Sequence, residues 1–145
     1  MSIVLGIDGK ISRGTAGTKA IIEMTNVADV TVNLSLGEAD VTTRAGGGWK
    51  ISLPTLFEAS VEFDMFVDPA DEDYTALAAA YFAKTPLSFF VDIGNGEGLD
   101  FDGYVGQFNL SQPLSEGQKV SISIKPTTSS RVPQWGKPKT GGTGV

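Results

Sequence analysis

The 145-residue sequence contains neither cysteine nor histidine. Without cysteine, the chain has no disulfide, no thiol nucleophile and no thiolate to offer a metal, as is usual for proteins that fold in a reducing cytosol. Without histidine, it lacks the commonest general base and the commonest metal ligand. These absences disfavour most enzyme classes. We predict that the chain is not an enzyme and has no catalytic residue, no cofactor and no metal site.

Long apolar stretches are also missing. No window of the sequence approaches the length that a membrane-spanning helix needs. The first ten residues, MSIVLGIDGK, have neither the basic start nor the long apolar stretch of a secretion signal. We therefore expect a soluble protein with no membrane partner and no secretory route.

Basic residues are scarce in most of the chain, whose formal net charge is −6. Residues 1–116 hold all 17 acidic residues and 6 basic ones, a net charge of −11, whereas residues 117–145 hold 5 basic residues and no acidic one. An acidic field of this kind excludes binding to nucleic acid phosphates by counterion release. The basic C-terminal part either keeps the chain soluble or docks on an acidic surface of a neighbour.

Alternating apolar and polar residues predict a mostly β protein. The five clearest predicted strands span residues 28–36, 58–67, 87–93, 99–110 and 118–125, and weaker ones span 3–7, 20–24 and 49–53. In the first of them, apolar residues occupy one face and polar residues the other, as strand geometry requires. We expect the apolar face in the core and the polar face in water. Glycines at 94 and 96 favour a hairpin turn, and Gly103 and Gly106 suggest a bulge.

One helix interrupts the strands, at residues 70–83. Its predicted packed face comprises Tyr74, Leu77, Ala78, Tyr81 and Phe82. Asp68 is the expected N-cap, Pro69 the first helical residue, and the acids at 71–73 favour the positive end of the helix dipole. The same acidic run is also compatible with a calcium site, but capping explains its spacing better.

The predicted fold class is a β-sandwich or tube-type barrel flanked by one α-helix, with an extended N-terminal arm, a long loop and a C-terminal tail. We expect an arm at residues 1–19, the sandwich at 20–125 and an extended basic tail at 126–145. The Gly-, Ser- and Thr-rich segment 8–19, the loop 37–48 and the tail are predicted to be ordered by neighbouring copies. Arms of this kind favour self-assembly.

Other chemical patterns have simpler explanations. The run GNGEGLDFDG at 94–103 resembles a calcium-binding nonapeptide, but such sites need stacked repeats. The run RGTAGTK at 13–19 lacks the spacing of a phosphate loop. Pairs of acids two residues apart on a strand lie roughly 7 Å from each other, as in inverting glycosidases, but solvated strand faces produce the same pairs. These pairs are Asp100 with Asp102 and Glu62 with Asp64.

Two tryptophans lie outside the clearest strands. Trp49 ends a Gly-rich loop and Trp135 lies in the basic tail. Exposed tryptophan is a common interface anchor. Trp49 is equally compatible with packing over the end of the sandwich, and Trp135 with a tail residue that has no role.

Several features between residues 28 and 126 resemble the major tail protein (tail tube protein) family of tailed bacteriophages. They are VTTR at 41–44, a Gly-then-Trp loop at 47–49, Leu-Pro before a strand carrying ASVEF at 59–63, the helix, and a late strand with two glycines. Thr55 departs from the resemblance, which favours glycine there.

The resemblance implies a structural protein whose copies form hexameric rings, stacked into a hollow tube that conducts DNA during genome delivery. It implies assembly in the host cytoplasm, a place in the virion tail, and several partners: tail tip or baseplate and terminator proteins, a tape measure protein in the lumen, and DNA that passes without specific binding. The implied lumen candidates are Glu62, Asp64 and Asp92, and the implied subunit-interface candidates are Arg44, Trp49, Arg131 and Trp135.

Two alternatives stay open. The inner tube of a contractile injection or secretion machine shares the implied fold but passes protein. A β-sandwich binding module for sugar or protein would remain monomeric, whereas either tube protein would assemble.

Overall fold

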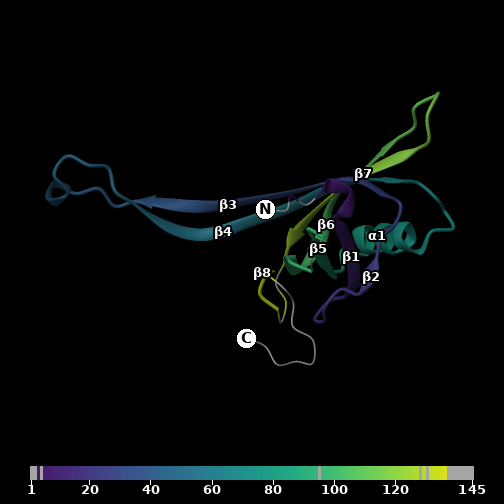
Figure 1. Cartoon of the computed structure of the whole chain (residues 1–145), viewed down its shortest axis with the longest axis horizontal. Helices are drawn as coiled ribbons and strands as arrows, with labels where there is room; N and C mark the ends of the chain where they lie inside the picture. Colours follow the sequence, from purple (N-terminus) through teal and green to yellow (C-terminus); the bar gives the residue numbers. More distant parts are fainter. Residues whose placement is uncertain (1–2, 4, 95, 128, 130, 137–145) are drawn as a thin grey trace.

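The computed structural model describes residues 3, 5–94, 96–127, 129 and 131–136. They form a mostly antiparallel β protein with one α-helix, as predicted (Figure 1). The strands are β1 (Lys10–Thr15), β2 (Ile22–Glu23), β3 (Val27–Asp40), β4 (Ser52–Phe66), β5 (Leu87–Asp92), β6 (Gly98–Ser111), β7 (Lys119–Pro126) and β8 (Gln134–Gly136). The α-helix is α1 (Glu72–Ala83), and two 3-10 turns are η1 (Gly6–Asp8) and η2 (Arg44–Gly46). No helix within the described ranges is long and apolar enough to cross a membrane.

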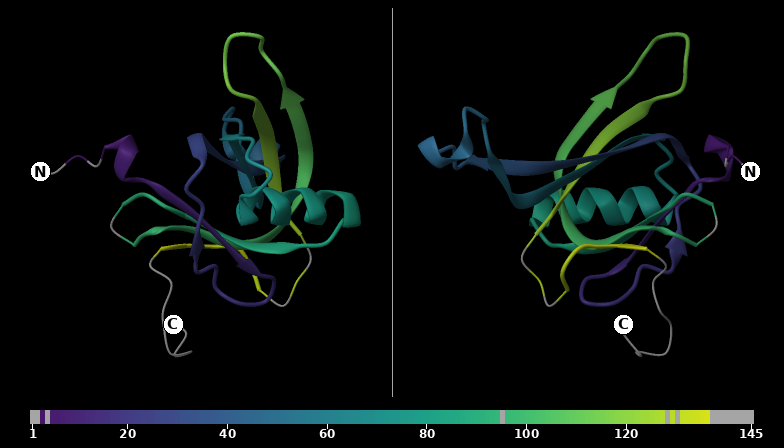
Figure 2. Two further views of the ribbon diagram at one scale, coloured as in Figure 1. Left: turned by 90° about the vertical axis from the view of Figure 1, so that its right-hand side faces the viewer. Right: turned by 60° about the vertical axis from the view of Figure 1, so that its left-hand side comes forward.

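All eight strands belong to one sheet, in the order β2-β1-β5-β6-β7-β4-β3, with β8 paired to β6. The long strand β6 joins the two halves, because its first part pairs with β5 and β8 and its second part with β7. The register shifts between Val105 and Gln107, where the predicted bulge at Gly106 lies. The sheet curves strongly, so one face encloses the core as the two layers of a sandwich would (Figure 2).

The core consists of apolar side chains from that inner face and from α1. Its buried members are Ile11, Met24, Val61, Phe63, Met65, Leu77, Phe89, Val91, Leu99, Phe101, Val105, Val120, Ile122 and Ile124. Each large apolar side chain buried in this way contributes about 1.5–3 kcal/mol to folding. The helix lies against β6, where the ring of Phe108 is 6.0 Å from that of Tyr74 and 5.7 Å from that of Tyr81.

The helix begins later than predicted. Asp71, not Asp68, is the N-cap, and its carboxylate accepts from the backbone N–H of Asp73 at 3.1 Å. The tertiary structure favours this start because the side chain of Asn26 donates to the other oxygen of Asp71 at 2.9 Å. Phe82, expected on the packed face, is 75% exposed.

The N-terminal segment differs from the predicted arm. Residues Lys10 to Thr15 form β1, which pairs along its whole length with β5 in the middle of the sheet. Strand pairing uses backbone groups, so small Gly, Ser and Thr side chains do not prevent it. The described residues of the weak predicted strand 3–7 contribute no strand.

Candidate functional site

The β3–β4 hairpin extends well beyond the rest of the domain (Figure 1). Its strands remain paired as far as Asp40 opposite Ser52. Near the body of the domain Val61 of β4 is fully buried, but Phe57 of the same strand is 86% exposed. The apolar face of the hairpin therefore begins in the core and ends in solvent.

This arrangement corrects the expected core face of residues 28–36. The strand and its alternation are as predicted, but Leu34 and Leu36 are 56% and 44% exposed. Alternation shows that one face of a strand is apolar and not what covers that face. The body of the domain ends before it reaches these side chains.

We call the exposed part the apolar hairpin face; it comprises Leu34, Leu36 and Phe57. Leu36 lies opposite Phe57 in the register, and Leu34 is two residues from Leu36 on β3, so the three side chains are neighbours on one face. All three are exposed. Large exposed apolar patches are rare on monomeric proteins and mark interaction sites.

The hairpin tip, residues 41–51, has a defined structure. The hydroxyl of Thr42 donates to Asp40 Oδ1 at 2.6 Å and accepts from the backbone N–H of Ile51 at 2.9 Å. Gly47 adopts a φ of 67°, which closes the turn after η2. The tip therefore has local hydrogen bonds of its own, although the sequence predicted a loop ordered by neighbours.

Two of the predicted interface residues lie in this tip. Arg44 is exposed and Trp49 is 77% exposed. The tip also carries Lys50 and no acidic residue. The structure thus places an exposed indole and two positive charges at the far end of the hairpin, where the interface assignment remains a prediction.

The C-terminal strap, residues 127, 129 and 131–136, lies against the sheet. Arg131 holds it there: its Nε and Nη2 donate to Asp102 Oδ1 at 3.0 and 2.8 Å. Its Nη1 donates to Asp100 at 3.0 Å and its Nη2 to the hydroxyl of Ser88 at 2.9 Å. Arg131, predicted at a subunit interface, thus makes these bonds within its own chain.

Asp102 is the centre of this network. Its side chain is fully buried, and its Oδ2 accepts from the backbone N–H of Gly17 at 2.8 Å. Burial by itself raises the pKa of Asp102, but hydrogen bonds from Arg131, Ser129 and Gly17 outweigh burial and lower the pKa. One carboxylate therefore joins the strap, β6 and the loop after β1.

These contacts also account for the acidic patterns in the sequence. Arg131 forms ion pairs with both Asp100 and Asp102. Asp73, expected only to favour the helix dipole, is paired with Arg13 of β1 at 2.7 Å. Within the described residues, no group of three or more acidic side chains could hold a metal ion.

A second surface, the polar sheet face, lies opposite the core on β3, β4, β7 and β6. The register aligns Glu62 with Thr31 on one side and Ser123 on the other. The hydroxyl of Ser121 donates to Asp64 Oδ1 at 2.7 Å. The aligned side chains are Thr31, Asn33, Ser35, Glu58, Ser60, Glu62, Asp64, Gln107, Asn109, Ser111, Lys119, Ser121, Ser123 and Lys125.

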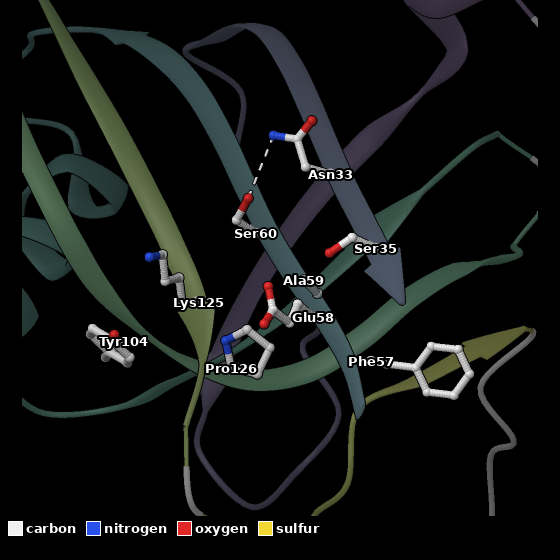
Figure 3. Close-up of a pocket in the computed structure, with 9 residues that line it drawn as sticks. All are labelled: Asn33, Ser35, Phe57, Glu58, Ala59, Ser60, Tyr104, Lys125 and Pro126. Atoms are coloured by element: carbon white, nitrogen blue, oxygen red, sulfur yellow. Dashed lines mark hydrogen bonds between the residues drawn. The ribbon is translucent and has the colours of Figure 1, made fainter. Parts of the chain in front are cut away.

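Part of this face is hollowed, as Figure 3 shows. The hollow has a volume of about 490 Å³ and is lined mainly by polar side chains, among them Asn33, Ser60 and Lys125. Lys119 and Lys125 lie on the polar sheet face because β7 pairs between β4 and β6, and alternation does not reveal which strands are neighbours.

The lumen candidates do not all lie together. Glu62 and Asp64 are on the polar sheet face, but Asp92 is on β5, which β6 and β7 separate from β4. Asp92 Oδ1 accepts from the backbone N–H groups of Gly94 and Gly96 at 2.7 and 3.0 Å. Asp92 therefore stabilises the β5–β6 turn, and its place in a lumen stays a prediction.

Trp135, the remaining interface candidate, lies in β8 opposite Leu99. Its indole N–H donates to Glu97 at 3.0 Å, and the side chain is 52% exposed. The N–H edge of the indole is thus hydrogen-bonded within the same chain. The exposed part of the ring is accessible to a neighbouring copy.

Sequence reasoning did not single out two features of the structure. The apolar hairpin face had a signal, since Phe57 continues the apolar alternation of β4 ahead of its first fully buried residue, Val61. The role of Asp102 had none, because its partner Arg131 is 29 residues away. Only the fold brings the two side chains together.

Comparisons with known proteins show a similarity in fold and none in sequence. No protein-family model matches the chain, and no curated protein matches its sequence. Among solved structures, the tail of an empty gene transfer agent particle with C6 symmetry shares 13% identity and a TM-score of 0.76, covering 90% of this chain and 97% of that chain. A subunit of the native gene transfer agent virion shares 14% identity at a TM-score of 0.72, with the same coverage.

The SPP1 tail tube, solved by solid-state NMR and cryo-EM, gives a TM-score of 0.70 at 16% identity. The match covers 94% of this chain and 80% of that one. The chain therefore has the fold of tail tube subunits over nearly its whole length.

Proposed function

We propose that this chain is the structural subunit of a phage-type tail tube. Six copies close into a ring, and rings stack into a hollow tube through which DNA passes. The shared fold supports this proposal, because it covers 90% of the chain and one of the matching tails has C6 symmetry. The role is structural and not catalytic.

The apolar hairpin face is the observation that carries the proposal. Phe57 is 86% exposed and Leu34 is 56% exposed on a hairpin that projects from its own domain. An isolated chain gains nothing by exposing these side chains, whereas an assembly buries them at about 25 cal/mol per Å² of apolar surface. One projecting hairpin per copy suits head-to-tail contacts, which generate a closed ring where the rotation between copies closes.

The polar sheet face suits the wall of a channel. Glu62 and Asp64 repel phosphate, and Lys119 and Lys125 offset part of that charge. A face rich in Ser, Asn and Gln with mixed charges gives DNA little to bind. DNA would therefore pass along this wall without specific recognition.

The remaining partners follow from this role. A tip or baseplate complex would start the tube, a terminator protein would end it, and a tape measure protein would occupy the lumen before DNA does. The site of action is the virion tail, after assembly in the host cytoplasm.

Negative-stain electron microscopy and light scattering of the purified full-length chain test the proposal. We expect hollow rods with a regular axial repeat, or six-fold rings, at rising concentration or after addition of the cognate tail-tip complex. A globular monomer that persists even with that complex would overturn the proposal and favour a binding module.

A further inference from the structure

An apolar groove lies between the β3–β4 hairpin and the C-terminal strap. Its volume is about 650 Å³. The hairpin contributes Leu34, Leu36 and Phe57 to its lining, and the strap contributes Val132, Pro133 and Trp135. Val132 is 74% exposed and Phe57 is 86% exposed, so the groove is open to a partner.

The hairpin tip of the same chain cannot fill this groove. Beyond the groove the two strands remain paired, from Leu36 opposite Phe57 to Asp40 opposite Ser52. A paired ribbon of this kind holds residues 41–51 at its far end, away from the domain (Figure 1). Any tip that enters the groove must therefore come from another copy.

The tip and the groove are complementary in character. Trp49 and Ile51 are 77% and 41% exposed in the tip, and aromatic anchors in apolar pockets dominate protein interfaces. The tip is also positive, with Arg44 and Lys50 and no acid. The groove carries Glu58 in its lining.

The strap does not oppose this charge. Its own arginine, Arg131, is already neutralised by Asp100 and Asp102 at 3.0 and 2.8 Å. A positive tip in the groove would therefore meet no unpaired cation among the described residues of the strap, and the nearby acid is Glu58, which lines both this groove and the hollow of the polar sheet face. Charge complementarity of this kind fixes orientation and suppresses wrong pairings.

We propose that the hairpin tip of one copy docks in this groove of a neighbouring copy, with Trp49 as the anchor. The inference rests on the proposed function and names one contact within it. Each copy then donates one tip and receives one tip, so the contact is heterologous and propagates through the assembly. The strap, held by Arg131, forms one wall of the receiving site.

Thiol cross-linking tests this contact cleanly, because the natural chain has no cysteine. One chain carries Lys50→Cys in the tip and another carries Val132→Cys at the groove. The two are mixed, brought to assembly conditions with the cognate tail-tip complex, and treated with a short bismaleimide. The matched control replaces Val132→Cys by Phe82→Cys on α1, a position with a similar exposure of 75%.

We expect a covalent dimer from the 50 and 132 chains and none from the 50 and 82 chains. Rods that form without the 50–132 product would overturn the docking and leave the tube intact. The product without rods or rings would support the docking and overturn the tube. Neither product nor rods would overturn both.

A substitution measures how much the anchor contributes. Trp49→Ala should raise the concentration needed for assembly by about tenfold or more, as loss of an aromatic hot spot does. Phe82→Ala should change it less than about twofold. The unfolding midpoint of the Trp49→Ala monomer should match that of the natural chain, since the side chain is exposed. An unchanged assembly concentration would overturn the proposal.

Discussion

Arg131 and Asp102 are joined by two hydrogen bonds, from Nε at 3.0 Å and from Nη2 at 2.8 Å, both to Oδ1. The carboxylate is fully buried and the guanidinium side chain is 20% exposed. Gly17 donates to the other oxygen. The pair therefore connects the C-terminal strap to β6 and to the loop after β1.

Removal of this guanidinium should destabilise the domain and release the strap. Arg131→Ala leaves Asp102 buried with Gly17 and Ser129 as its remaining hydrogen-bond partners, and we expect a loss of about 2–4 kcal/mol in the free energy of unfolding. Arg131→Lys keeps the charge without the two-pronged geometry, so its loss should be smaller. Urea denaturation measures both. Equal midpoints for the natural chain and Arg131→Ala would contradict the role assigned to the pair.

The same carboxylate predicts a dependence of stability on pH. The pKa of Asp102 is lowered in the folded state, so its stabilisation is complete above its unfolded pKa of about 3.9 and is lost as the pH falls through the folded-state value. Stability should therefore fall below about pH 4, and less steeply in Asp102→Asn than in the natural chain. Urea midpoints between pH 6 and pH 2 give both slopes. Equal slopes for the two chains would show that Asp102 does not contribute to the pH dependence of stability.

A second buried pair connects β1 to the helix. Arg13 and Asp73 are only 12% and 9% exposed and lie 2.7 Å apart. Arg13→Ala should lower the free energy of unfolding by about 2–4 kcal/mol, because it leaves a buried charge unpaired. Lys10→Ala is the control, since the pair of Lys10 and Glu23 is exposed and should contribute less than about 1 kcal/mol. Thermal unfolding that ranks the two variants alike would contradict the structure.

One glycine is required by close packing. A Cβ on Gly103 would lie 2.6 Å from the carbonyl oxygen of Lys125 and 2.6 Å from the ring of Phe101. Gly103→Ala should therefore cost about 1–3 kcal/mol through overpacking. Gly6→Ala is the matched control, because nothing lies within 4 Å of its Cβ position. Urea midpoints compare the stability of the two variants. If Gly103→Ala were as stable as the control, β6 and β7 would be able to move apart at this position without cost.

The polar sheet face predicts an effect on DNA. If Glu62 lies in the lumen, Glu62→Lys tubes should retain fluorescent single-stranded DNA on co-sedimentation, and added salt should release it. The natural tubes should retain little. Glu116→Lys makes the same charge change in the β6–β7 loop and serves as the control. Equal retention by the two variant tubes would place Glu62 outside the channel.

Much of the fold could be predicted from the sequence. Alternation located the five strands β3 to β7, and helical spacing located α1 to within two residues at its start. It missed β1, because a strand of Lys, Ser, Arg, Gly and Thr contributes only Ile11 to the core. It also missed β8, a strand of three residues, since so short a segment carries no period.

The candidate site was predictable only in part. Glu62 and Asp64 could be placed on a polar face, because side chains two residues apart share a face of a strand. Lys119 joins them only through the pairing of β7 with β4. Arg131 was predicted as a subunit-interface candidate in the basic tail, and the three side chains to which it donates lie 29 to 43 residues away in the chain.

The sequence by itself determined that this protein is a mostly β domain without the groups that most enzymes use, because composition and side-chain period are local properties. Only the tertiary structure decided what covers the apolar face of each strand. It buried Val61 and left Phe57 of the same strand in solvent, since the body of the domain ends between them. Whether an apolar side chain is buried in the core or left exposed depends on what packs against it in space. Strand periodicity does not show this.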